Sequence, residues 1–168
     1  IEGSDSSNLP TFETTVSYAN WSNDSKIYMQ ALNTDKISIN SVQHLPIYKF
    51  DTLNDLEQFK KNFGSIFTMD SGYDEVPSFN SATQKYDNAF FEENSLLLVY
   101  VSAGNCTHRF KMQNVGYDNK SFSVHVVETT NAEFVDTAMA GWFITVAMSD
   151  DLIKTVTSFD ADLNNAID

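Results

Sequence analysis

The sequence predicts a single α+β domain, built mostly from antiparallel β-sheet and covered by one main amphipathic helix. Three observations lead to this fold class: a helical pattern over residues 52–63, a nearly continuous apolar stretch over residues 95–102, and two alternating segments, residues 109–117 and 121–130, around a polar turn. An apolar stretch of strand length is typical of a strand buried on both faces, whereas alternation around a turn is typical of a hairpin. The chain of 168 residues suits one domain. We assign that domain to residues 11–160.

The N-terminal part of the chain contains short strand candidates. Residues 1–10, which are rich in Ser, Asp and Asn, are expected to form a flexible leader. Residues 11–19 have the β-rich composition of a first strand. Residues 26–32 and 37–42 are two further strand candidates, joined by a tight loop at residues 33–36.

The main helix is predicted over residues 52–63, where apolar side chains recur three and four residues apart. Thr52 can cap its N-terminus, and Asp55 lies three residues later, as in a capping box. Lys60 and Lys61 complement the helix dipole at the C-terminal end. Gly64 is expected to end the helix in the left-handed conformation.

The second half of the chain begins with a predicted short helix over residues 86–93. It leads into the apolar strand at residues 95–102, which we expect to lie centrally in the sheet. After the hairpin, residues 131–141 show little periodicity and are predicted to form a loop, and residues 142–148 alternate as a strand.

The hairpin turn is predicted at residues 118–120. Pairing of Asp118 with Ser121 would place Tyr117 opposite Phe122 and make one face of the hairpin apolar. Farther from the turn the apolar positions of the first strand change parity, which predicts a β-bulge near Gln113–Asn114.

The C-terminal end is predicted to contain one helical turn and one strand. Ser149 and the two Asp residues after it can cap the helical turn. Residues 155–159 are interpreted as a last edge strand, and residues 161–168 as a frayed tail.

The composition excludes several function classes. The chain carries 23 Asp and Glu against 10 Lys and Arg, for a net charge of −13. Such a surface repels nucleic acid and weakens binding to anionic lipid, because both depend on neutralising phosphate. The single cysteine, Cys106, excludes an intrachain disulfide. No apolar stretch reaches the length of a membrane-spanning helix.

About half of the chain carries motifs that resemble a known family. The motifs are a Tyr-Asp-x-Ala-Phe-Phe-Glu-Glu-Asn stretch, a Leu/Val strand, a small-residue loop, a His-Arg pair and a segment from Asp to Trp that contains Met and Ala. In this chain they lie, in the same order, at Tyr86–Asn94, Leu96–Val101, Ser102–Asn105, His108–Arg109 and Asp136–Trp142. This pattern resembles an uncharacterised family of small exported proteins and lipoproteins of gut clostridia and related Firmicutes. The same half also resembles, more faintly, the C-terminal domain of the protease-complex subunit PrcB.

These resemblances carry expectations about location and role. The first implies an extracellular or cell-surface-anchored protein, with a lipid anchor upstream of Ile1, and no established activity. We therefore expect a binding or structural module whose partner is a protein or a glycan at the cell surface. The PrcB resemblance implies the alternative of an inhibitor or regulator of an extracellular protease.

The candidate binding residues lie in loops that a rigid sheet would present at its ends, over residues 20–25, 102–108 and 131–141. Exposed aromatic side chains in such loops are a common means of gripping glycans and peptides. The candidates are Trp21, Asn105, Cys106, His108, Arg109, Asp136, Met139 and Trp142.

A hydrolase is the third hypothesis, centred on Cys106 and His108 or on an Asp/Glu pair. Alternation would place both side chains on one face of a strand, but an active pair also needs a close hydrogen bond, an orienting group and an oxyanion donor. Residues two apart on one strand rarely provide this geometry. We expect no catalytic residues.

We also expect no metal site and no cofactor. A site built from His44, His108 and His125 would need two or three of them to converge with a carboxylate. Residues 70–75 resemble a calcium loop, but Ser81 stands where such a loop carries its last Glu, so calcium binding there is left open.

Overall fold

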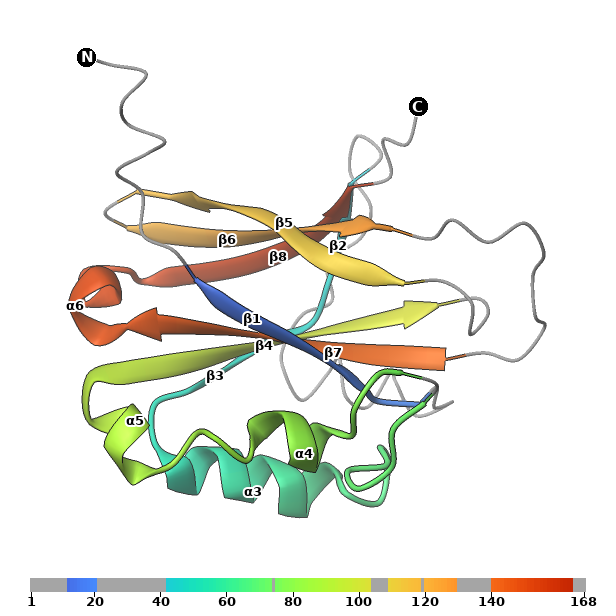
Figure 1. Cartoon of the computed structure of the whole chain (residues 1–168). Coiled ribbons are helices and arrows are strands. Elements are labelled where there is room, and N and C mark those ends of the chain that lie inside the picture. Colours follow the sequence, from blue (N-terminus) through green and yellow to red (C-terminus); the bar gives the residue numbers. More distant parts are fainter. Residues whose placement is uncertain are drawn as a thin grey trace.

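Two β-sheets and a layer of helices make up the computed structural model, which describes residues 12–20, 42–73, 75–103, 109–118, 120–129 and 140–164. Figure 1 shows the order of the layers, with the helices α3, α4 and α5 on one face of the first sheet and the second sheet on the other. The predicted α+β domain, mostly β, is confirmed. The second sheet as a separate layer was not predicted.

The first sheet, sheet A, is fully antiparallel. Its order is β1 (Glu13–Tyr18), β7 (Ala140–Ser149), β4 (Asn94–Ala103) and β3 (Ile47–Phe50). The predicted apolar strand is the central β4, which pairs with β7 over its whole length of ten residues. A strand with neighbours on both edges and layers on both faces has no solvated side, which is why its sequence shows no polar alternation.

The two faces of sheet A build two separate cores. On β4 the odd-numbered Leu97, Val99 and Val101 pack toward the second sheet, and the even-numbered Leu96 and Leu98 pack toward the helices. On β7 the same alternation sends Trp142, Ile144, Val146 and Met148 toward the second sheet and Phe143 toward the helices.

The second sheet, sheet B, is mixed. Its order is β2 (Val42–His44), β8 (Ser158–Asn164), β6 (Ser121–Glu128) and β5 (Phe110–Tyr117). The described part of β6 alternates strictly, with Phe122, Val124 and Val126 in the core. Sheet B therefore has one face packed on sheet A and one polar outer face.

The predicted hairpin is confirmed in detail. Tyr117 pairs with Phe122, and the register shifts between Met112 and Asn114, at the predicted bulge. Asp118 donates its backbone N–H to the carbonyl of Ser121 at 3.0 Å. Its carboxylate accepts the backbone N–H groups of Lys120 and Ser121, and these bonds hold the pKa of Asp118 below its usual range.

The main helix, α3 (Leu53–Phe63), begins as predicted. Thr52 accepts the backbone N–H of Asp55 at 3.0 Å, and the Asp55 carboxylate accepts the backbone N–H of Asp51. The expected left-handed Gly64 is wrong, because its φ of −67° is right-handed. A Cβ at Gly64 would lie 2.7 Å from the Lys60 carbonyl oxygen, so close backbone approach explains the glycine.

Three short helices complete the description. The predicted one is α5 (Asn88–Glu93), capped by Asp87, and the predicted helical turn is α6 (Asp150–Ile153), capped by Ser149. A further helix, α4 (Phe79–Thr83), is capped by Ser78, whose hydroxyl accepts the backbone N–H of Ser81.

The C-terminal strand needs correction. β8 covers residues 158–164, so it continues through the first four residues of the expected frayed tail, and Ala161 and Leu163 are buried in it. It is not an edge strand, because it lies between β2 and β6 and runs parallel to β6. Pairing with a strand on each side stabilises β8, and its short polar sequence gives no indication of this pairing.

Several predicted segments lie outside the described residues. These are the leader, the strand candidates within residues 21–41 and the loop over residues 131–139. In the part of the chain that is described, no helix is long and apolar enough to cross a membrane.

Phe143 is the centre of the core between sheet A and the helices. Its ring lies 5.0–5.8 Å from four others, those of Phe59, Phe67, Phe79 and Tyr100. We expect Phe143→Ala to lower the free energy of unfolding by about 3–5 kcal/mol, because the cavity cannot collapse between a sheet and a helix layer. Urea denaturation measures this loss. The exposed Lys61→Ala should change stability by less than about 0.5 kcal/mol, and similar values for both variants would contradict the packing described here.

Candidate functional site

Three aromatic side chains and one arginine gather where β1 ends and β7 begins. Tyr18 stacks on Tyr73 with ring centroids 5.6 Å apart, and Trp142 lies 5.7 Å from Tyr18 and 6.2 Å from Tyr73. The guanidinium of Arg109 lies over the Trp142 ring at 4.8 Å and over the Tyr73 ring at 6.0 Å. We call these four residues the aromatic–arginine cluster.

Backbone pairing positions the aromatic members. Tyr18 and Trp142 are direct partners in the β1–β7 ladder, which brings their side chains together on the sheet B side. Tyr73 comes from the loop before α4, where it exchanges two backbone hydrogen bonds with Val76. The Tyr18 N–H donates to the Pro77 carbonyl at 2.8 Å, which fixes this loop against the end of β1.

Arg109 reaches the cluster from sheet B. It immediately precedes β5, and its carbonyl accepts the backbone N–H of Thr129 at 2.8 Å. Its guanidinium therefore crosses from one sheet to an aromatic ring of the other. A cation over an indole face contributes about 0.5–2 kcal/mol, depending on desolvation.

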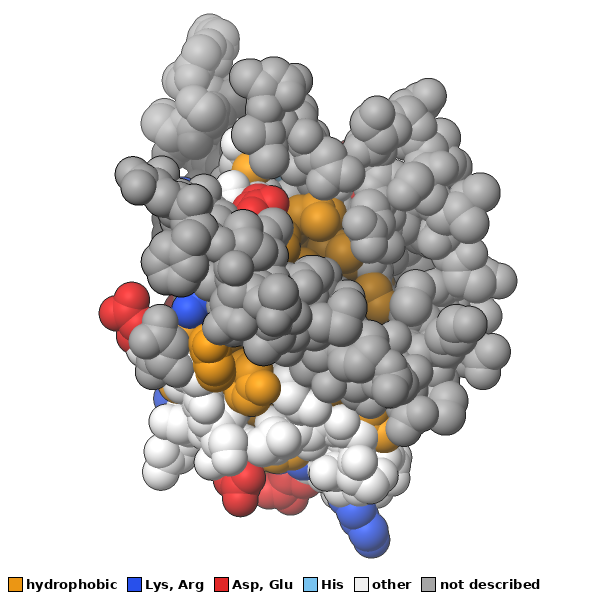
Figure 2. All heavy atoms as spheres, turned by 90° about the vertical axis from the view of Figure 1, so that its right-hand side faces the viewer, with side chains coloured by type: hydrophobic (Ala, Val, Ile, Leu, Met, Phe, Trp, Pro, Cys, Tyr) orange, Lys and Arg blue, Asp and Glu red, His pale blue; other side chains and the backbone are white. Residues whose placement is uncertain are grey.

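Burial separates the floor of the cluster from its rim. Trp142 is 1% exposed, whereas Tyr18, Tyr73 and Arg109 are partly exposed. Trp142 is therefore the buried floor of the cluster. Tyr18, Tyr73 and Arg109 form its rim, which is the part that a partner could touch. Figure 2 looks onto this end of the molecule, where hydrophobic side chains reach the surface beside a Lys or Arg side chain.

The neighbouring backbone is tightly packed. A Cβ at Gly141 would lie 2.4 Å from the Asn20 carbonyl and 2.7 Å from the Tyr100 hydroxyl, so only glycine fits beside Trp142. Burial, with a smaller effect of Tyr18, raises the pKa of Tyr100 far above its usual range. Tyr100, which packs on the helix side of sheet A, therefore stays neutral at physiological pH.

The structure brings together two of the eight predicted site residues, Arg109 and Trp142. The other six, Trp21, Asn105, Cys106, His108, Asp136 and Met139, lie outside the described residues, so the Cys106/His108 hydrolase hypothesis stays a prediction. Tyr18 and Tyr73 are the members that the sequence did not assign to a site. Tyr73 stands in a Gly-turned loop, which marks it as a loop aromatic, but nothing in the sequence links it to Arg109.

A shallow hollow of about 470 Å³ lies along the outer edge of β1, between this strand and α4. Its lining includes Thr15 of β1 and the segment from Pro77 to Lys85 with α4. The ion pair between Lys85 and Glu13, 2.8 Å long, lies next to it, and its hydrogen bond raises the pKa of Lys85. Pro77, which lines the hollow, also accepts the backbone N–H of Tyr18, so this residue connects the hollow to the cluster.

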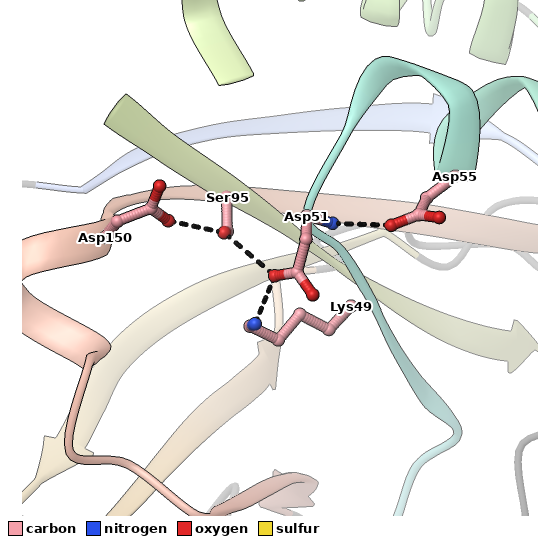
Figure 3. A network of polar contacts seen from close by, with 5 residues as sticks. All are labelled: Lys49, Asp51, Asp55, Ser95 and Asp150. Carbon is pink, nitrogen blue, oxygen red and sulfur yellow. Dashed lines mark hydrogen bonds and ion pairs between the residues drawn. The ribbon is translucent and has the colours of Figure 1, made fainter. Parts of the chain in front are cut away.

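A group of polar side chains connects three elements where β4 begins, at the end of the strand far from the aromatic–arginine cluster. The Ser95 hydroxyl lies 2.6 Å from a carboxylate oxygen of Asp150 and 3.1 Å from one of Asp51, so the two carboxylates share its single proton, and Lys49 pairs with Asp51 (Figure 3). Ser95 is 1% exposed and connects the start of β4 to Asp51 and to α6, and we call this group the Ser95 tie.

Described side chains offer little for a metal. No group of three or more His, Cys, Asp or Glu side chains among them could hold an ion. In the predicted calcium-loop segment, Asp70 and Glu75 are exposed and Asp74 lies outside the described residues.

No family model, curated protein or solved structure matches this chain. The family resemblances therefore stay predictions.

The Ser95 tie is testable through stability. We expect Ser95→Ala to lower the free energy of unfolding by about 1–3 kcal/mol, because two carboxylates lose a shared donor in a partly buried place. Thermal or urea unfolding measures the loss. Ser158→Ala, at an exposed serine in sheet B, is the matched control and should be near neutral. A neutral Ser95→Ala would show that the tie contributes nothing.

The Arg109 contact makes a separate prediction. Arg109→Met keeps much of the apolar stem but removes the charge over Trp142, and it should cost about 0.5–2 kcal/mol. The control is Lys111→Met, an exposed cation two residues along β5, which should cost less than about 0.5 kcal/mol. Equal losses in urea denaturation would contradict a specific stack on Trp142.

Proposed function

We propose that this chain is a non-catalytic binding module at the cell surface, and that it grips a protein or glycan partner at the rim of the aromatic–arginine cluster. The observation that supports this is the stack of two partly exposed tyrosines beside a guanidinium, on a buried tryptophan floor. Tyr, Trp and Arg are the residues that most often dominate binding energy at interfaces.

The rigidity of the rim favours binding. Tyr18 is fixed by the β1–β7 ladder, Tyr73 by its two bonds to Val76, and Arg109 by the backbone bond from Thr129. Side chains that are already ordered lose little entropy when a partner arrives. The adjoining hollow along β1 extends the surface that a polypeptide or an oligosaccharide could cover.

The charge distribution restricts the partner. A net charge of −13 repels nucleic acid and anionic membranes at long range. Arg109 offers a guanidinium that can pair with a carboxylate or a hydroxyl at short range. A neutral or cationic partner with one acceptor group placed at Arg109 satisfies both conditions.

Location outside the cell, held by a lipid anchor, is supported by the family resemblance of the sequence. Detection of the native protein in the membrane fraction of its host, and its release when the lipid anchor is removed, would support that location. Recovery from the cytosol alone would contradict it.

The alternative of a PrcB-like inhibitor or regulator of an extracellular protease is supported by the faint resemblance of residues 86 onward. It predicts tight, saturable inhibition of at least one protease in a panel. If no protease changes its rate with the folded protein in excess, this alternative is removed.

The proposed binding role is tested with the folded protein on a glycan array and against a displayed peptide library. We expect Tyr73→Ala and Arg109→Met to weaken binding of any selected ligand at least tenfold, because each removes a central contact. Lys111→Met is the matched control and should bind like the wild type. Ligands that bind all three variants equally would place the site elsewhere. Failure of both screens to find a ligand would overturn the proposal.

A further inference from the structure

The strand β1 forms one outer edge of sheet A. Among the described residues it pairs with β7 alone, apart from a single parallel bridge between Tyr18 and Ser78 at its C-terminal end. In an outer strand, every second residue directs its backbone N–H and C=O groups away from the sheet. Such an edge is a template on which another chain can add a strand.

The register shows which residues of β1 face outward. Ala19, the residue after the strand, donates its N–H to a carbonyl of β7 at 2.9 Å, so the odd-numbered residues face β7. Tyr18 donates its N–H to the Pro77 carbonyl at 2.8 Å, so the even-numbered residues face outward. Thr14 and Val16 therefore direct their N–H and C=O groups away from β7, and these groups have no backbone partner in the part of the chain that the structure describes.

The hollow between β1 and α4 leaves space beside this edge. Thr15 lines it from the strand, and Pro77 and Lys85 line it from the other side. Within the described ranges, the chain pairs with this edge only at Tyr18, so the part before that residue is open. The side chains of an added strand alternate between the two faces of the sheet, so every second one would enter the hollow.

The outer edge of β1 lacks the usual protection against strand addition, which consists of short length, lysine and bulges. Of the other outer strands that are described, β2 has three residues and β3 has four, one of which is Lys49. The longer β5 contains Lys111 and the bulge after Met112. In contrast, β1 keeps one register over six residues and carries no charged side chain from Thr14 to Tyr18.

The chemistry of this edge selects a polypeptide as the partner. The outward groups of Thr14 and Val16 repeat every second residue, about 6.8 Å along the strand. Another extended backbone offers acceptors and donors at the same repeat, whereas the hydroxyl groups of a glycan do not. The net charge of −13 disfavours a second copy of this chain or an acidic segment, and it favours an uncharged or cationic one.

We propose that β1 accepts an extended, uncharged or cationic segment of a partner protein, which adds a strand to sheet A through the backbone groups of Thr14 and Val16. This inference rests on the proposed binding function and narrows its partner to a polypeptide. Tyr18, at the end of the same strand, belongs to the rim of the aromatic–arginine cluster, so one segment can pair with β1 and contact the rim. The backbone pairing supplies affinity, and the hollow and the rim select side chains.

The experiment uses the folded full chain and a peptide selected against it from the displayed library, with binding measured by calorimetry. We expect Thr14→Pro to weaken binding at least tenfold, because proline removes an outward N–H and leaves the ladder with β7 intact. Far-UV circular dichroism and the Tm establish that the variant is folded.

The matched control is Lys49→Pro, at the opposite edge of the same sheet. Tyr100 of β4 donates its N–H to the Pro46 carbonyl, so the register of β3 turns the N–H of Lys49 outward as well. This variant should bind the peptide like the wild type. Equal binding by Thr14→Pro and the wild type would overturn strand addition.

A measurement on the wild-type chain tests the same inference without a variant. The amides of Thr14 and Val16 should exchange hydrogen at least tenfold more slowly when the selected peptide is bound, because each gains a backbone acceptor. A bound peptide that leaves both exchange rates unchanged would overturn strand addition.

Other outcomes separate this inference from the proposed function. Peptide binding that Tyr73→Ala abolishes and Thr14→Pro leaves unchanged would overturn strand addition but keep the cluster as the binding site, and so would selection of glycans alone. Self-association in sedimentation experiments that Thr14→Pro abolishes would identify a second copy as the occupant and overturn the inference. Failure to find any ligand would overturn both proposals.

Discussion

The antiparallel pair of β4 and β7 is the constraint on which the rest of this structure depends. Both strands are apolar on both faces over most of their length, and they pair over ten residues at the centre of sheet A. An apolar ribbon of this kind must be covered on both sides. The helices cover one side through a cluster of phenylalanine rings, and sheet B covers the other through both aromatic and aliphatic side chains, among them Phe122 and Val124.

The candidate site is a consequence of this arrangement. At the end where β7 begins, Trp142 is held in the sheet B side of the core, and Arg109 from sheet B closes over its ring. Tyr18 and Tyr73 then complete the cluster at the seam between the two sheets.

Local signals made much of this fold predictable. The cap at Thr52, the bulge between Met112 and Asn114 and the turn at Asp118 each depend on residues close in sequence, and all are confirmed. Non-local pairing was not predictable, because nothing within a short polar strand specifies which neighbour it joins. The internal, parallel position of β8, the separate second sheet and the meeting of Tyr73 with Arg109 all depend on such pairing.

Hydrogen exchange of backbone amides, followed by NMR, tests the central role of the β4–β7 pair most directly. Amides from Leu96 to Val101 and from Phe143 to Val146 should exchange most slowly, at the rate set by global unfolding, because these strands open only when both cores are lost. The hairpin of β5 and β6, which has one solvated face, should exchange sooner. Equal or faster exchange in β4 and β7 than in this hairpin would contradict the account.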